Sequence, residues 1–112
     1  MAYPVVVIPF LNVDAMALFP FILVKRAAFK HDKVLIRHET IHLQQAAELL
    51  IVPFYILYLL NYLVNRFKYA NHYKAYYEII FEREAYHNEC DKSYLKNRKL
   101  WAWRFYFSNE VH

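Results

Sequence analysis

The first 24 residues contain two short apolar runs separated by turn-forming positions. Residues 5–8 are a β-branched run closed by Pro9, and residues 17–24 are a second apolar run that contains Pro20. β-Branched and aromatic residues favour extended backbone, whereas proline cannot donate a hydrogen bond to a strand ladder. The pattern therefore predicts two short strands, the second of which is an edge strand or bends at Pro20.

After Asp32, whose side chain can cap a helix, apolar and histidine positions recur at steps of three and four residues. These steps are the period of one face of an α-helix. The pattern predicts a helix with one face formed by Val34, His38, Ile41, His42, Gln45, Ala46 and Leu49. Two histidines therefore share an apolar stripe.

The most hydrophobic segment is residues 49–65. At a helical rise of ~1.5 Å per residue it reaches about 25 Å, whereas a bilayer core of ~30 Å usually needs about 20 apolar residues. We favour a buried helix or a lid that packs beside the active site. A helix at a membrane interface is the main alternative, since tyrosines and the basic Arg66 and Lys68 accompany the segment, and a full span is the least favoured.

Helical periodicity returns over residues 74–97 and predicts one long helix. One face of this helix carries Ala75, Glu78, Ile79, Glu82, Ala85, Tyr86 and Glu89. Three carboxylates on one face repel one another unless a positive charge lies opposite them. The aromatic tail, residues 100–107, is expected to pack back onto the domain, a partner or lipid, because so many exposed aromatic side chains would be unfavourable.

Together these elements predict an α+β fold, mainly α, with two active-site helices, an apolar helix and a small N-terminal β hairpin or edge strands. With 112 residues the chain is long enough for one core, so we expect a single domain over residues 1–112. Glycine is absent, which favours long helices over a turn-rich β architecture.

The formal charge of +4 arises largely from two clusters, residues 25–37 and 92–104. Such clusters are usually solvated faces; contact with a membrane surface is the alternative, and the absence of a recognition motif argues against nucleic acid. Cys90 is the only cysteine, which suits a reducing compartment. No cleavable signal peptide is evident, so we expect a cytoplasmic protein, with membrane association as an alternative. The oligomeric state stays open.

Metal chemistry is indicated at His38-Glu39-Thr40-Ile41-His42. On a helix, His38 and His42 lie one turn apart on the same face, and Glu39 lies beside them where it can hold a water molecule bound to the metal. A catalytic zinc site takes three protein ligands and leaves the fourth position for water. A third ligand is therefore needed, and the helix after Tyr73 is the obvious source.

This motif, followed downstream by Phe81-Glu82-Arg83-Glu84-Ala85, resembles the gluzincin zinc metallopeptidases and, in chain length, their small single-domain members, the minigluzincins. In that family a second helix supplies a glutamate ligand from a Glu-x-x-Ala motif, which matches Glu82. The resemblance covers residues 34–90. It implies one Zn²⁺ per chain held by His38, His42 and Glu82, Glu39 as general base, and a peptide or protein substrate; Glu84 would point away from the metal.

The chain departs from the family after the alanine, where many relatives have an aspartate that orients a ligating histidine and this chain has Tyr86. Such support is usually worth ~10 to 100-fold in affinity or activity. Gln45, Asn88 and Glu78 are alternatives for the orienting role. The group that would stabilise the oxyanion stays open among Tyr69, His72, Tyr73, Tyr76 and Tyr86.

Two other classes of protein fit parts of the pattern. Residues 39–42 and 84–87 both read Glu-x-x-His, the repeated unit of di-iron carboxylate bundles, but the apolar helix lacks the further carboxylate that such a site needs. The other alternative is a non-catalytic zinc-binding or membrane-surface interaction protein. Closed structural zinc sites usually have four ligands and favour cysteine, of which there is only Cys90.

Overall fold

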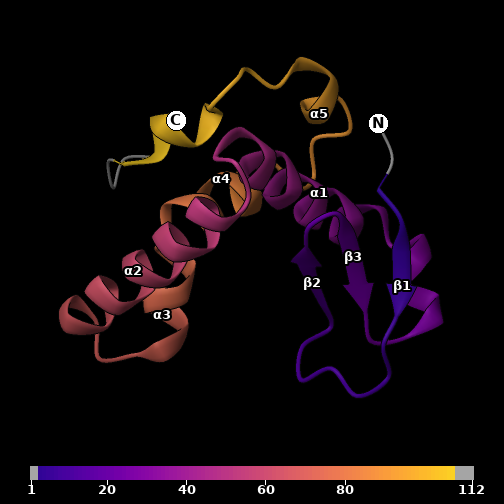
Figure 1. Cartoon of the computed structure of the whole chain (residues 1–112), viewed down its shortest axis with the longest axis horizontal. Helices are drawn as coiled ribbons and strands as arrows, with labels where there is room; N and C mark the ends of the chain where they lie inside the picture. Colours follow the sequence, from indigo (N-terminus) through magenta and orange to yellow (C-terminus); the bar gives the residue numbers. More distant parts are fainter. Residues whose placement is uncertain (1–2, 108–112) are drawn as a thin grey trace.

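In the computed structural model, which describes residues 3–107, three short strands form a small sheet at the N-terminal end (Figure 1). β1 (Val5–Val7) pairs in parallel with β3 (Phe21–Val24), and β2 (Ala15–Leu18) pairs antiparallel with β3. The strand order β1-β3-β2 puts β3 in the centre. Helices make up most of the remaining chain, so the fold is α+β and mainly α, as predicted.

Residues 17–24, predicted to form one strand, belong to two strands, β2 and β3. Phe19 and Pro20 form the turn between β2 and β3. Proline has no N–H to donate, so it is tolerated in this turn where a ladder position would lose a hydrogen bond. The expected bend at Pro20 is confirmed. The edge-strand alternative is wrong for β3, because β1 pairs with its other side.

Helix α1 (Lys33–Glu48) follows a short 3₁₀ helix, η1 (Ala27–His31), and begins where the sequence predicts. The Asp32 side chain accepts a hydrogen bond from the Leu35 N–H at 3.1 Å. This bond satisfies one of the free N–H groups of the first turn, which is the stabilising action of an N-cap.

Helix α1 lies between the two parts of the hydrophobic core. Leu43 packs against Ile22 and Val24 of the central strand, and all three are buried. One turn further on, Ala46 packs against residues of the helices that follow, of which Phe54 and Phe81 belong to the same buried cluster. Helix α1 therefore contacts both the sheet and the helices that follow it.

At its end α1 turns sharply into α2 (Val52–Lys68), and the two helices are bent by 114°. The Ile51 N–H bonds to the Ala46 carbonyl at 2.7 Å and the Leu50 N–H to the Ala47 carbonyl at 3.3 Å, the hydrogen bonds of a Schellman cap. Leu50 and Ile51 adopt φ of 63° and 72°, a region that usually favours glycine. No single helix in residues 3–107 is both long enough and apolar enough to cross a bilayer. The bent α1–α2 pair, taken together, has the required length and composition.

The long helix predicted over residues 74–97 is broken into α3 (His72–Tyr77), α4 (Ile80–Asn88) and α5 (Tyr94–Asn97). The first break falls at Ile79, which is extended and fully buried. There the Ile80 N–H donates to the Asn61 side chain of α2 at 2.8 Å. The prediction of one helix is wrong because this contact and the burial of Ile79, both tertiary, outweigh the local preference.

The aromatic tail packs back onto the domain, one of the alternatives predicted for it. It forms a 3₁₀ helix, η2 (Ala102–Tyr106), beside α4. Trp103 packs edge-on against Phe81 with ring centroids 5.4 Å apart, and the Tyr106 hydroxyl accepts a hydrogen bond from the Asn88 side chain at 2.9 Å.

Tyr55 joins α2 to the β2–β3 hairpin, and its loss should weaken the fold. Its hydroxyl accepts from the Phe19 N–H at 2.9 Å and donates to the Ala17 carbonyl at 3.0 Å. Tyr55→Phe leaves both backbone groups without this partner and should lower the free energy of unfolding by about 1–3 kcal/mol. Urea denaturation measures the change. Tyr73→Phe, at an exposed tyrosine of α3, is the control and should change stability by less than about 0.5 kcal/mol; equal effects of the two changes would contradict the prediction.

Candidate metal centre

The three predicted ligands meet between α1 and α4. His38 and His42 lie one turn apart on α1, and Glu82 lies in the first turn of α4; all three are buried. The Glu82 Oε1 atom is 2.9 Å from His38 Nε2 and 3.0 Å from His42 Nε2. One potential ligand atom from each residue lies within 4.8 Å of the others. Side chains that are 40 and 44 residues apart in the sequence thus converge on one point.

The residues present fit a metal such as zinc. His42 Nε2 is buried and lacks a hydrogen bond, although Glu82 Oε1 is close to it, because the angle between the groups is unfavourable. A buried nitrogen without a hydrogen bond is costly unless something else occupies its lone pair. Two imidazoles and one carboxylate are a donor set typical of zinc enzymes. Within residues 3–107 this is the one cluster of three such donors. Three protein ligands would leave one position of a four-coordinate zinc ion for water.

The charges of the cluster act strongly on one another. Burial by itself lowers the pKa of His42, but the opposing effects, of which the negative charge of the adjacent Glu82 carboxylate is the largest, raise that pKa to about 9. Burial by itself raises the pKa of Glu82, but the charge of His42 and the hydrogen bond to His38 lower that pKa below its usual range. In the metal-free protein the pair is therefore ionised at neutral pH.

His38 is oriented by a residue that sequence reasoning did not select. Its Nδ1 lies 2.8 Å from Glu89 Oε1, and the Arg37 side chain donates to the Glu89 carbonyl at 2.6 Å. A carboxylate on the far nitrogen of a ligating histidine holds the ring in place and makes the ligand more basic. Glu89 follows Glu82 by seven residues, two helical turns, so the spacing could have indicated it. Tyr86, at the position where the gluzincin pattern has aspartate, instead packs against the His38 ring at 4.5 Å.

His42 is oriented by Gln45, one of the three residues considered for this role from the sequence. His42 Nδ1 lies 2.8 Å from Gln45 Oε1. The Gln45 amide nitrogen donates to the Phe81 carbonyl at 3.0 Å and to Glu84 Oε1 at 2.9 Å. Because both of those partners can only accept, the amide oxygen must face His42. Nδ1 then carries a proton, and Nε2 is the ring nitrogen that faces the cluster.

The other two candidates for orienting a histidine are used elsewhere. Asn88 donates to the Glu84 carbonyl and the Tyr106 hydroxyl at 2.8 and 2.9 Å. Glu78 lies 3.9 Å from Arg83 as a partly exposed ion pair. Neither residue belongs to the three-donor cluster.

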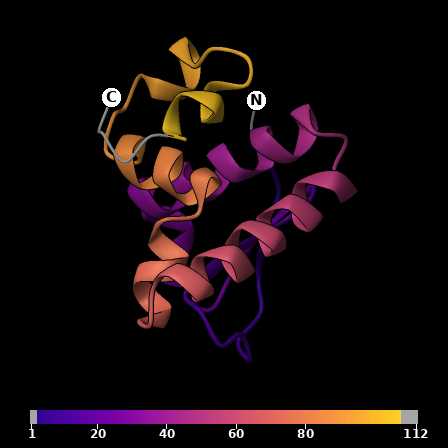
Figure 2. The ribbon, with the colours of Figure 1, turned by 90° about the vertical axis from the view of Figure 1, so that its left-hand side faces the viewer.

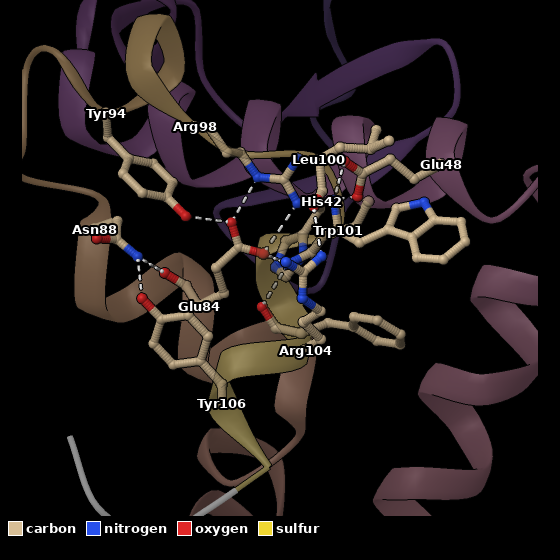
Figure 3. A network of polar contacts seen from close by, with 12 residues as sticks. His42, Glu48, Glu84, Asn88, Tyr94, Arg98, Leu100, Trp101, Arg104 and Tyr106 are labelled. Carbon is tan, nitrogen blue, oxygen red and sulfur yellow. Dashed lines mark hydrogen bonds and ion pairs between the residues drawn. The ribbon is translucent and has the colours of Figure 1, made fainter. Parts of the chain in front are cut away.

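Glu84 lies away from the cluster, as the resemblance implies, yet it is fully buried at the centre of a polar network (Figure 3). Arg98 donates to Glu84 through Nε at 2.6 Å and, on its other side, to Glu48 through Nη1 at 2.7 Å. The Tyr94 hydroxyl also donates to Glu84, at 2.6 Å. Arg98 therefore clamps the end of α1 to α4.

The second Glu-x-x-His unit does not join the cluster. The Glu84 carboxylate accepts from Arg98, Tyr94 and Gln45, and the His87 ring packs against Tyr106 at 5.8 Å. In the described part of the chain the two units thus do not converge in the way a di-iron site requires.

A cleft of about 290 Å³ opens beside the cluster. Its lining joins the site to β2 and to the inner face of α2: Val13, Ala15, Met16, Ala17, Glu39, His42, Phe54, Tyr55, Tyr58, Tyr76 and Glu82. Glu39 is buried, and burial raises its pKa against the lowering effect of His42 and His38. A carboxylate with a raised pKa is a better proton acceptor at neutral pH than an ordinary one. A larger hollow of about 400 Å³ is lined by Lys30, Arg37 and other residues, none of them a candidate ligand.

Two tyrosines of the cleft carry hydroxyl groups close to the cluster. The Tyr58 hydroxyl donates to Glu82 Oε2. Burial and the Glu82 charge raise the pKa values of Tyr58 and Tyr76, so both stay protonated. Of the five residues considered for the oxyanion, Tyr76 is the one that lines the cleft. Tyr58 was missed as a site residue, because the sequence places it in an apolar helix with no sign of which face meets the metal ligands.

Comparisons of the chain with protein-family models, with curated proteins and with solved structures found no match.

Gln45 should matter for metal affinity in a way that its neighbour does not. Gln45→Leu removes the acceptor that fixes the His42 ring, and zinc affinity should fall by ~10 to 100-fold. Gln44→Leu, one position away on α1 and only half-buried, is the matched control and should leave affinity within about twofold of wild type. Competition titration with a chromogenic chelator measures both. Equal affinities for the two variants would contradict the role assigned to Gln45.

Zinc binding should release a proton from His42. At pH 7 the metal-free protein carries this proton, because Glu82 raises the pKa of His42 to about 9. A metal needs the same lone pair, so each unit of pH between about 7 and 9 should raise zinc affinity about tenfold for this proton, with a plateau above the pKa. Isothermal titration in buffers of different ionisation enthalpy gives the number of protons released. A zinc affinity that is constant between pH 7 and 9 is incompatible with the expectation.

Proposed function

We propose that this protein is a zinc-dependent metallopeptidase of gluzincin type, with His38, His42 and Glu82 as ligands and Glu39 as general base. The observation that carries the proposal is the convergence of two buried histidines and a buried glutamate, from two helices, at the edge of a cleft that Glu39 also lines. A three-donor set that opens to a cleft is typical of a catalytic site, whereas structural zinc sites are closed by four ligands.

Each residue of the site has a separate role in the proposed hydrolysis of a peptide bond. Zinc, when bound, would act as a Lewis acid that makes water more acidic and polarises a scissile carbonyl. Glu39 accepts the proton of the attacking water and delivers it to the leaving amine, a task suited to a carboxylate whose pKa burial raises. Tyr58 and Tyr76 border the cleft as protonated phenols and are the candidate donors to the developing oxyanion.

An extended peptide fits this cleft better than a compact ligand does. One wall is formed by residues of β2, from Ala15 to Ala17. In the described residues β2 pairs only with β3, so its other edge has no strand partner, although the Ala17 carbonyl already accepts a hydrogen bond from Tyr55. An exposed strand edge can hydrogen-bond to an added strand through the backbone. We therefore propose peptide or protein substrates bound alongside β2.

Two glutamate variants separate the base from the ligand. Glu39→Gln removes the proton acceptor but no direct ligand, so it should retain most of the zinc and lose activity by roughly 10²- to 10⁴-fold. Glu82→Gln removes a charged ligand and should lose zinc as well as activity. Elemental analysis and cleavage of a peptide library measure the two properties.

The control for both variants is Glu78→Gln, which changes a partly exposed glutamate outside the cluster and should keep zinc and activity. A Glu39→Gln protein that cleaves at the wild-type rate would remove the peptidase mechanism. Zinc bound by wild type with no cleavage of any library peptide would favour a non-catalytic zinc protein, and two irons per chain would favour the di-iron alternative.

A further inference from the structure

Helix α2 has two chemically different faces, and the apolar one faces outward. Its inner side carries Phe54 and Asn65, both buried, together with the half-buried tyrosines of the cleft. The outer side is made of exposed aliphatic and aromatic residues: Val52, Ile56, Leu57, Leu59, Leu60, Leu63, Val64 and Phe67. At about 100° per residue these eight positions cover nearly half of the helix circumference. In a helix that packed only on its own domain, the exposed side would be the polar one.

The apolar surface continues beyond α2. A groove of about 260 Å³ joins the helix to α4 and η2, and its lining is almost entirely apolar: Leu57, Leu60, Asn61, Val64, Ile80, Phe81, Trp103 and Phe107. Phe107 is 63% exposed and Trp101, just before η2, is 46% exposed. In Figure 2, α2 runs across the face turned to the viewer, with η2 above it. The two elements thus present one continuous apolar face.

Basic residues border this face. On the helix circumference Arg66 lies just beyond one edge of the apolar arc and Lys68 just beyond the other, and both are exposed. Arg104 on η2 is also exposed. Neither α2 nor η2 contains an acidic residue. The charge of the border therefore complements an anionic surface.

We propose that the outer face of α2, with η2, docks onto a membrane surface that contains anionic lipid. A helix of ~25 Å is too short to cross a bilayer core of ~30 Å but can lie in the plane of the headgroup boundary. Aliphatic side chains then enter the acyl region while lysine and arginine remain at the headgroups. A protein partner would be expected to meet hydrogen-bonding groups in the patch, and this arc offers only hydrocarbon. The surface does not involve the metal cluster, so its test is independent of zinc.

Vesicle flotation tests the proposal directly. Wild-type protein should float with phosphatidylcholine vesicles that contain phosphatidylglycerol, and less with phosphatidylcholine alone. Leu59→Glu/Leu63→Glu changes two outer positions of α2 and should reduce binding by about tenfold or more, because two apolar side chains no longer leave water. Circular dichroism verifies that the variant is folded, as expected for changes at side chains that are 56% and 45% exposed.

The matched control is Phe10→Glu/Val34→Glu, which adds the same two negative charges at exposed apolar residues outside α2 and η2. It should bind almost as wild type does. Equal loss in the control would show that net charge alone governs binding and would overturn the docking surface. The two tryptophans of the chain, Trp101 and Trp103, report on the same face. Their emission should shift to shorter wavelength on binding and be quenched by lipids brominated on the acyl chain.

Failure of wild type to float with either vesicle would overturn the proposal. So would a dimer in solution that Leu59→Glu/Leu63→Glu dissociates while no vesicle binds, because the face would then be covered by a second copy of the chain. Sedimentation velocity without lipid separates that case from the expected one. Arg66→Gln/Lys68→Gln should remove the preference for phosphatidylglycerol and keep the weaker binding to phosphatidylcholine.

Discussion

The buried carboxylate of Glu82 is the constraint on which the rest of this structure depends. An ionised group removed from water is costly unless charges and hydrogen bonds compensate it. His38 and His42 provide this compensation, with both Nε2 atoms within 3.0 Å of one Glu82 oxygen. That arrangement requires α1 and α4 to lie side by side, and the contacts of Gln45 and Arg98 also join these two helices.

A second buried ion-pair centre forms around Arg98, which lies in the C-terminal part of the chain. Its guanidinium bridges Glu48 at the end of α1 and Glu84 in α4. Glu84 in turn accepts from Gln45, whose amide oxygen faces His42. The Gln45 amide thus links the ion pairs of Arg98 to the cluster of His42 and Glu82, and it can take only one orientation. Through Arg98, the C-terminal part of the chain therefore helps to position the metal cluster although it supplies no ligand.

Helix α2 connects the cleft to the outer surface. Its inner face brings Tyr58 to Glu82 and Asn61 to the start of α4. Its outer face is apolar with a basic border. Because a helix offers opposite faces to opposite neighbours, one segment can close the cleft and also form a docking surface. On this proposal the candidate active site lies one helix diameter, about 10 Å, from the lipid headgroups.

The sequence by itself determined the features that depend on local spacing. A four-residue step suffices to place His38 and His42 on one face of α1, and Asp32 suffices to begin that helix, because both effects act within a helical turn. Glu82 was found only through a resemblance, since nothing in its surroundings along the chain indicates which helix face meets α1. The tertiary structure decided the break at Ile79 and the roles of Glu89 and Tyr58, whereas the division of residues 17–24 between two strands follows from the local turn at Pro20. The break at Ile79 and the roles of Glu89 and Tyr58 each depend on a partner more than 15 residues away, and the sequence does not state which elements lie side by side.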